Sequence, residues 1–263
     1  MNFVSAIGKH TLARCRSAAD ALAFLGETLV EAIGMIFCPW RFRFGDFALA
    51  FERASFDGFG ITIGIGFLLG VILAFQSAAA LRMFGVEVYI ADLLSIALFR
   101  ELGPIITAVI LAGRSGSAFA AEIGTMKVNE ELDALSTMGL PPVRFLVMPR
   151  VVAATLAMPI LTIFADLAGL IGGAIVLEIM RVPNSVYWRH VISITTPFMV
   201  WLGLAKAAMF GLMIGIIGCG SGMNTRATAD GVGTSATAAV VWSIVAIAVS
   251  DGVLAVICFV WHL

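Results

Sequence analysis

Five long apolar runs, separated by short polar segments, dominate the chain after residue 57. The first lies between Asp57 and Arg82 and holds 24 uncharged residues. A helix needs about 20 apolar residues to cross the hydrocarbon core of a bilayer, so this run is long enough to span. The other runs extend from Leu93 to about Ala121, between Arg150 and Glu178, from near Pro197, and from about Ala236 to Trp261. The pattern predicts an all-α integral membrane protein whose residues 58–263 form a five-span transmembrane bundle.

The N-terminal segment, residues 1–38, has a different pattern. Apolar residues recur every three or four positions and form one stripe: Leu22, Leu25, Leu29, Ile33 and Ile36. Charged residues interrupt the segment too often for it to span. We therefore expect residues 1–55 to form an interfacial helix followed by an elbow near Trp40 and Arg41, within one domain over residues 1–263. A soluble helix that packs on a partner subunit is the alternative.

Composition agrees with a membrane protein and indicates its orientation. The chain is 60% hydrophobic and 13% charged, whereas soluble domains carry about 25% charged residues. Five spans put eleven of the 16 Lys and Arg residues on the side of the N-terminus, four on the other side, and Lys206 within the membrane. The positive-inside rule then places the N-terminus in the cytoplasm and the C-terminus outside. No basic n-region precedes the first apolar residues, so we expect no cleavable signal peptide.

Several kinds of function have no support in the sequence. The chain has no G-x-x-x-x-G-K-[ST] motif, so it cannot bind and hydrolyse ATP through a P-loop of its own. No nucleophile–base constellation suggests an enzyme, and we expect no cofactor in this chain. The four cysteines and three histidines are scattered, which gives no metal or disulfide framework. No basic domain points to nucleic acid.

Charged residues within the predicted spans are candidates for function: Arg100, Glu101, Asp166, Lys206 and Asp251. A charge at the centre of a membrane helix costs about 2.5–3.5 kcal/mol on insertion scales, so such charges usually pair or mark a transport pathway. Arg100 and Glu101 are adjacent and point about 100° apart on a helix. We expect Glu101 to pair with Lys206, or with an Arg100 from a neighbouring helix or a second subunit. Structural ion pairs and a transport pathway both remain possible. An ion-coupled secondary transporter that uses Glu101, Asp166, Lys206 and Asp251 as a relay is the alternative function.

A short helix is predicted over residues 125–139, between the second and third spans. Its apolar edge consists of Val128, Leu132, Leu135 and Met138. Asn129 is a suitable N-cap, Gly139 a suitable C′ residue, and the two prolines at 141–142 prevent the helix from continuing. Its acidic residues favour the N-terminal end of the helix dipole: Glu130, Glu131 and Asp133. An ordinary solvated loop helix is possible, but this framing favours contact with a cytoplasmic partner.

The region from Arg100 to Arg150 resembles the signature region of MlaE/YrbE-type permeases. The resemblance rests on R-E-L-G-P at 100–104, A-G-R-S-G-S-A at 112–118, A-E-I-G-T-M at 121–126 and M-G-L-P-P at 138–142. These permeases are the membrane subunits of MCE-associated ABC transporters. The resemblance implies a homodimer, an interfacial helix with five spans per subunit, and a place in the bacterial inner membrane.

The resemblance also implies partners. Two copies of a separate ABC ATPase, which carry the ATP and magnesium, would dock on the helix between spans two and three. The positions implied for that contact are Thr125, Met126, Lys127, Glu130, Glu131, Asp133, Leu135 and Met138. A periplasmic MCE-domain protein would bind the outer side, and a small STAS-domain protein often binds the ATPase.

The cargo implied by the resemblance is phospholipid or a similar amphiphile, in a cavity between two permease subunits. The implied cavity positions are Leu73, Gln76, Ala80, Leu81, Phe84, Arg100, Glu101, Leu102 and Lys206. Two departures from the family pattern bear on function. The segment G-V-G-T-S-A-T-A-A-V-V before the last span lacks two arginines common in the family, which weakens an expected contact with the ATPase. The glycine-rich first span and the small residues at 78–80 indicate a different cavity shape.

Overall fold

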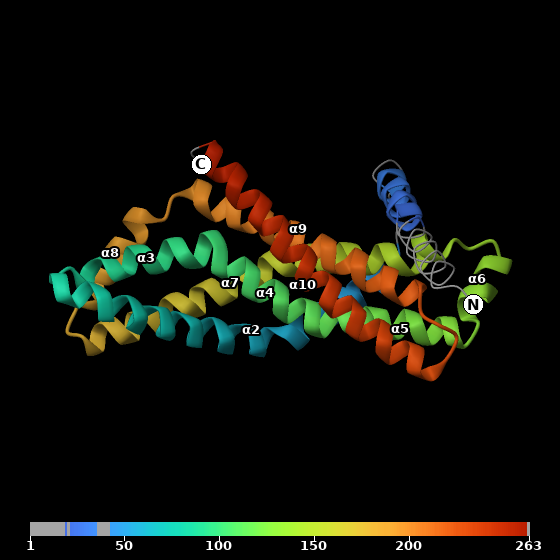
Figure 1. Ribbon diagram of the computed structural model, residues 1–263, viewed down its shortest axis with the longest axis horizontal. Helices are drawn as coiled ribbons and strands as arrows, with labels where there is room; N and C mark the ends of the chain where they lie inside the picture. The colour runs from blue at the N-terminus through green and yellow to red at the C-terminus, as the bar shows by residue number, and fades with distance from the viewer. Residues whose placement is uncertain (1–18, 20–21, 36–42, 262–263) are drawn as a thin grey trace, which may run out of the picture.

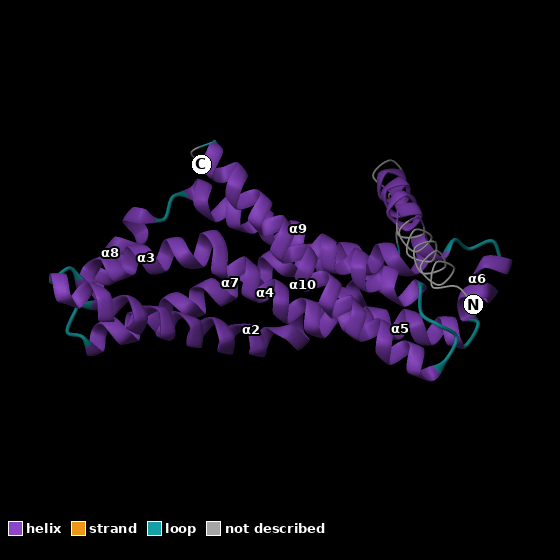
Figure 2. Cartoon of the chain, viewed as in Figure 1, coloured by secondary structure: helices purple, strands orange, loops and turns teal. Residues whose placement is uncertain are grey.

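The computed structural model describes residues 19, 22–35 and 43–261, and every regular element in that part of the chain is helical (Figures 1 and 2). Five helices are long and apolar enough to cross a membrane: 44–84, 87–128, 143–179, 197–223 and 230–260. This result confirms the prediction of an all-α, multi-pass membrane protein with five spans.

The first span, α2 (Phe44–Leu81), begins well before the apolar run and continues into η2 (Arg82–Phe84). It packs along α7 (Met148–Ile179) through glycines. A Cβ atom added at Gly66 or Gly70 would overlap the backbone of Ala165 or Gly169, so the two helices approach as closely as their backbones allow. Gly60 and Gly64 lie four residues apart on the same helix. A Cβ atom added at either of them would have no neighbouring atom within 4 Å.

The second span is a continuous series of helical segments in which the α-helix is twice interrupted by a π-helical turn. The segments are η3 (Glu87–Tyr89), α3 (Ile90–Ala97), η4 (Leu98–Leu102), α4 (Gly103–Leu111), η5 (Ala112–Gly116) and α5 (Ser117–Val128). Both η4 and η5 are π-helical, and single π turns within helices are frequent at functional sites. The motifs R-E-L-G-P at 100–104 and A-G-R-S-G-S-A at 112–118 overlap these two π turns.

The third span consists of η6 (Val143–Val147), another π-helical turn, and α7. A short helix, α8 (Asn184–Ile194), follows, and α9 (Pro197–Met223) and α10 (Ala229–Val260) complete the bundle. Pro197, near which the fourth span was predicted to start, occupies the first turn of α9, and the Thr196 side chain accepts a hydrogen bond from the Met199 amide at 3.3 Å. The segment 231–241, predicted to lie before the last span, instead forms the first turns of α10.

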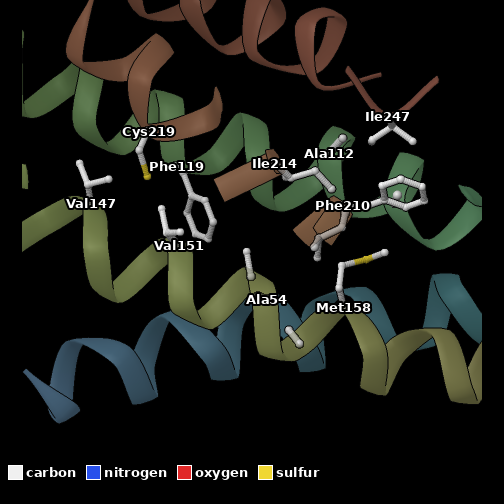
Figure 3. Packing of buried hydrophobic residues seen from close by; sticks show 14 of the residues in the cluster. Ala54, Ala112, Phe119, Val147, Val151, Met158, Phe210, Ile214, Cys219 and Ile247 are labelled. Atoms are coloured by element: carbon white, nitrogen blue, oxygen red, sulfur yellow. The ribbon is translucent and has the colours of Figure 1, made fainter. Parts of the chain in front are cut away.

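The larger buried core joins α2, α4, α5, α7, α9 and α10. Figure 3 shows Phe119, Val151, Met158, Phe210 and Ile214 directed toward one another between these helices. Glycines on α9 bring the backbones together in this region, because Gly211 contacts Ala154 on α7 and Gly218 contacts Gly116 on η5. The core therefore combines large side chains with close glycine contacts.

The helix between spans two and three is shorter than predicted. The structure extends α5 to Val128 and restricts α6 to Glu131–Thr137. Asn129 does not cap α6: it follows the end of α5, and the chain turns at Glu130, whose φ is 60°. The predicted end is confirmed. Gly139 has φ 75°, and its amide and that of Leu140 donate to the carbonyls of Ser136 and Leu135, which is a Schellman motif.

The described N-terminal segment 22–35 is helical and stands out from the bundle, in blue at the upper right of Figure 1. Its apolar stripe is exposed: Leu22, Leu25, Leu29 and Ile33. The opposite face contacts the bundle, since Thr28 is buried and Glu31 pairs with Arg144 at 2.7 Å. An exposed apolar stripe on a surface helix agrees with the interfacial prediction. Ile36 and residues 39–42 of the predicted elbow (39–44) lie outside the described residues, and the last residue of that elbow, Phe44, begins α2.

Candidate functional site

Four charged side chains from three membrane-spanning segments converge, and we call them the charge cluster: Arg100, Glu101, Lys206 and Asp251. Lys206 Nζ lies 2.5 Å from Glu101 Oε2 and 2.8 Å from Asp251 Oδ1. Arg100 Nε lies 3.9 Å from Glu101 Oε1. The predicted pairing of Glu101 with Lys206 thus occurs within one chain, from η4 to α9, and α10 supplies a second carboxylate.

Lys206 is the centre of the charge cluster. Its side chain is 3% exposed, against 34% for Glu101 and 17% for Asp251. Lys206 Nζ also donates to the Arg100 carbonyl oxygen at 3.3 Å. An α-helix would satisfy that oxygen with the amide of residue 104, but Pro104 has no N–H. One lysine therefore balances two carboxylates and also satisfies a carbonyl that the proline leaves open.

Asp166 is buried in α7 and lies apart from the charge cluster. A Cβ atom added at Gly103 would collide with Asp166 Oδ1, so Gly103 makes room for this carboxyl group. Within the described part of the chain, Asp166 Oδ1 has no hydrogen-bond partner. The second span therefore turns Glu101 toward α9 and Gly103 toward α7. The four residues predicted for an ion relay are split between two helix interfaces.

The predicted cargo residues of the first span occupy two environments. Leu73 and Leu81 are half-buried and pack against a second core cluster, formed by residues of α2, α3, α7 and α8. Gln76 and Ala80 are exposed, and Phe84 is 78% exposed. On the second span, Leu102 is half-buried beside Glu101. The exposed residues of this set thus lie on the outer surface of the chain.

The predicted docking residues are only partly accessible. Exposed at the end of the bundle are Glu130, Glu131, Asp133 and Met138, on and beside α6, opposite α8 (Figure 1). Thr125 is exposed on α5, while Met126 and Leu135 are half-buried. Lys127 Nζ donates to the Met223 carbonyl oxygen at 2.6 Å and so satisfies the C-terminal end of α9. The accessible surface of this region is therefore mainly acidic.

Comparisons with known proteins identify the family. A family model described as the permease MlaE matches residues 48–257, which include the whole charge cluster and α6. The chain belongs to the MlaE permease family. A probable ABC transporter permease of Synechocystis sp. is 43% identical over 72% of each chain. A probable ABC transporter permease of Rickettsia bellii is 35% identical over 95% of each chain. The intermembrane phospholipid transport system permease protein MlaE of Haemophilus influenzae is 30% identical over 98% of each chain.

The MlaE-family motif A-E-I-G-T-M contains a polar contact that sequence reasoning missed. Glu122 Oε1 accepts from Arg53 Nη1 at 2.8 Å, and Glu122 Oε2 lies 3.0 Å from Arg150 Nη2. One carboxylate therefore connects α2, α5 and α7 at the end of the bundle nearest α6. Only the three isolated charges were visible in the sequence, and nothing in their spacing indicated that they meet.

Proposed function

We propose that this chain is the permease subunit of an ABC transporter that moves phospholipid or a similar amphiphile between the inner membrane and a periplasmic MCE protein. The observation that carries the proposal is the similarity to the Haemophilus influenzae phospholipid transport permease, which covers 98% of both chains. The five spans and the charge cluster fall within the matched family region.

In this proposal the energy comes from another chain. The sequence lacks a P-loop, so ATP and its magnesium would bind a separate cytoplasmic ATPase. The exposed acidic residues Glu130, Glu131 and Asp133 support α6 as the docking element, because they project beyond the bundle on a helix with a defined end. A homodimer would present two such helices to two ATPase copies, with a small STAS-domain protein as a further partner. This chain would itself be non-catalytic.

The proposed orientation follows the distribution of basic residues. With the N-terminus and α6 in the cytoplasm, eleven of the 16 Lys and Arg residues lie on the cytoplasmic side. The end of the bundle that carries η2 and α8 would then face the periplasm and the MCE protein. The exposed stripe of segment 22–35 supports a position in the cytoplasmic interface.

The proposed cargo path runs along the first and second spans. Each buried methylene is worth about 0.8 kcal/mol, so exposing two acyl tails to water would cost on the order of tens of kcal/mol. The tails must therefore stay against apolar surface, which Leu73, Ala80, Leu81, Phe84 and Leu102 supply. The exposure of Ala80 and Phe84 supports a cavity that a second subunit closes. Gln76, Arg100 and Glu101 would face the headgroup, with Lys206 holding Glu101 in place.

The ion-coupled alternative has less support. Family membership points to an ABC transporter permease, and the proposed relay residues do not form one chain, because Asp166 lies at a different interface from Glu101. The close pairing of Lys206 with two carboxylates is sufficient to explain three of the four charges as structural.

The proposal is tested by purifying the chain from its native membrane in mild detergent. Proteins and lipids in the same sample are then identified by mass spectrometry. We expect an ABC ATPase and an MCE-domain protein to co-purify, together with bound phospholipid. Recovery of the permease with neither an ATPase nor lipid, at a detergent concentration that preserves its dimer, would contradict the proposal.

A further inference from the structure

A cavity of about 510 Å³ lies between the N-terminal part of α2, the C-terminal part of the second span and the start of the third span. It is separate from the charge cluster and from the proposed cargo path. Four arginines and three carboxylates line it, and we call it the arginine cavity: Arg43, Arg53, Arg114 and Arg150, with Asp46, Asp57 and Glu122. The lining carries one more positive than negative charge.

The arginines keep donors available despite their pairing. Glu122 lies between Arg53 and Arg150, as described above, and Arg114 Nη2 lies 3.2 Å from Asp57 Oδ2. A guanidinium group carries five N–H donors, so one carboxylate contact uses a minority of them. The side chains of Arg53 and Arg114 are 57% and 42% exposed. They can therefore donate to an added anion without losing their present partners.

The position of the cavity matches the headgroup layer. Asp57 is the last charge before the apolar part of α2, and the helix rises roughly 38 Å from there to Arg82, against about 30 Å for a hydrocarbon core. Asp57 and its partner Arg114 therefore lie near the boundary of the hydrocarbon. Arg53 lies one turn further out. Under the orientation proposed above, this boundary belongs to the cytoplasmic leaflet.

Apart from Ser115, the rest of the lining is apolar, which distinguishes the cavity from a site for a free ion. It includes Leu49, Ala118, Met126, Phe145 and Leu146. Leu49 is 50% exposed, and the guanidinium carbon of Arg43 lies 5.3 Å from the centre of the Phe145 ring. A ligand that fills the cavity must therefore present an anionic group to the arginines and apolar atoms to the remaining wall.

We propose that the arginine cavity binds the phosphate headgroup of an anionic phospholipid from the surrounding leaflet. The phosphate would accept hydrogen bonds from Arg53 and Arg114, and the glycerol and upper acyl atoms would contact Leu49 and Leu146. This lipid is a bound partner of the bundle and not the cargo. Because its ligands come from α2, η5 and η6, in the first three spans, it would hold together the end of the bundle that carries α6.

The test uses the purified full-length permease in mixed micelles, with binding measured by native mass spectrometry against phosphatidylglycerol, phosphatidylcholine or inorganic phosphate. We expect phosphatidylglycerol to be retained over phosphatidylcholine. The double variant Arg53→Gln/Arg114→Gln should bind it about 25-fold more weakly, since each basic residue near the surface contributes about fivefold. Arg82→Gln, at the other end of the same helix, is the matched control and should change binding less than twofold.

A second variant leaves the charges intact. Ala118 is exposed and lines the cavity, so a tryptophan at this position would fill the cavity. Ala118→Trp should therefore reduce phosphatidylglycerol binding to the level of the double variant. Equal loss in Arg82→Gln would show general attraction to interfacial arginines and overturn the proposal. Displacement of the lipid by inorganic phosphate at equal concentration would show a simple anion site and also overturn it. The proposal would also be overturned if the double variant bound the lipid as well as the wild type but no longer co-purified with the ATPase. The cavity would then be a contact site for a protein.

Discussion

Replacing Lys206 with methionine would remove the cation that holds Glu101 and Asp251 together. Removing one partner of a buried ion pair typically costs about 3–5 kcal/mol, because the remaining charge loses its compensation. Lys206 is 3% exposed, but Glu101 is 34% exposed and Asp251 17%, so water can partly solvate both carboxylates. We therefore expect the lower end, about 3 kcal/mol. For a chain of this size that corresponds to a fall of roughly 6–12 °C in Tm.

The measurement is thermal unfolding of the detergent-purified variant, followed by size-exclusion chromatography of the soluble fraction. The triple variant Lys206→Met/Glu101→Gln/Asp251→Asn removes the charges together and leaves no uncompensated carboxylate. Its Tm should recover most of the loss, because neutral groups of similar shape replace the ion pairs. A single variant as stable as the wild type, or a triple variant no more stable than the single one, would refute the view that Lys206 is the centre of the cluster.

Three further substitutions test the fold and the proposed surfaces. Gly70→Leu should destabilise the bundle by about 1–3 kcal/mol in the same unfolding assay, because it forces α2 away from α7, whereas Gly64→Leu on the open face should have little effect. Leu73→Trp should slow lipid transfer in reconstituted vesicles, and a wild-type rate would remove this residue from the cargo path. Glu131→Lys should reduce ATPase recovery in a pull-down, with Glu178→Lys at the opposite end of the third span as the control; equal recovery in both would argue against α6 as the docking element.

The spans could be predicted from sequence because a bilayer requires long apolar helices, and few charges interrupt them here. The pairing of Glu101 with Lys206 could also be predicted, since a buried charge has few possible partners in such a chain. The contact of Asp251 with Lys206 could not be predicted, because it depends on how α9 and α10 pack. The separation of Asp166 likewise depends on the space that Gly103 leaves.

The errors have local causes. The start of α6 was misplaced because Asn129 is a good N-cap by type, whereas the chain turns at Glu130 in a left-handed conformation that glutamate seldom adopts. The contact of Glu122 with Arg53 was missed because 69 residues separate them. The cargo and docking residues remain predictions, since both depend on surfaces that other subunits would cover.

The most direct test of the account is lipid transfer by the permease reconstituted with its ATPase in proteoliposomes that contain a fluorescent phospholipid. We predict transfer that requires hydrolysable ATP, stops when the ATPase is omitted, and does not respond to a proton gradient. Transfer that persists without ATP and follows an imposed proton gradient would contradict the account and support ion-coupled transport.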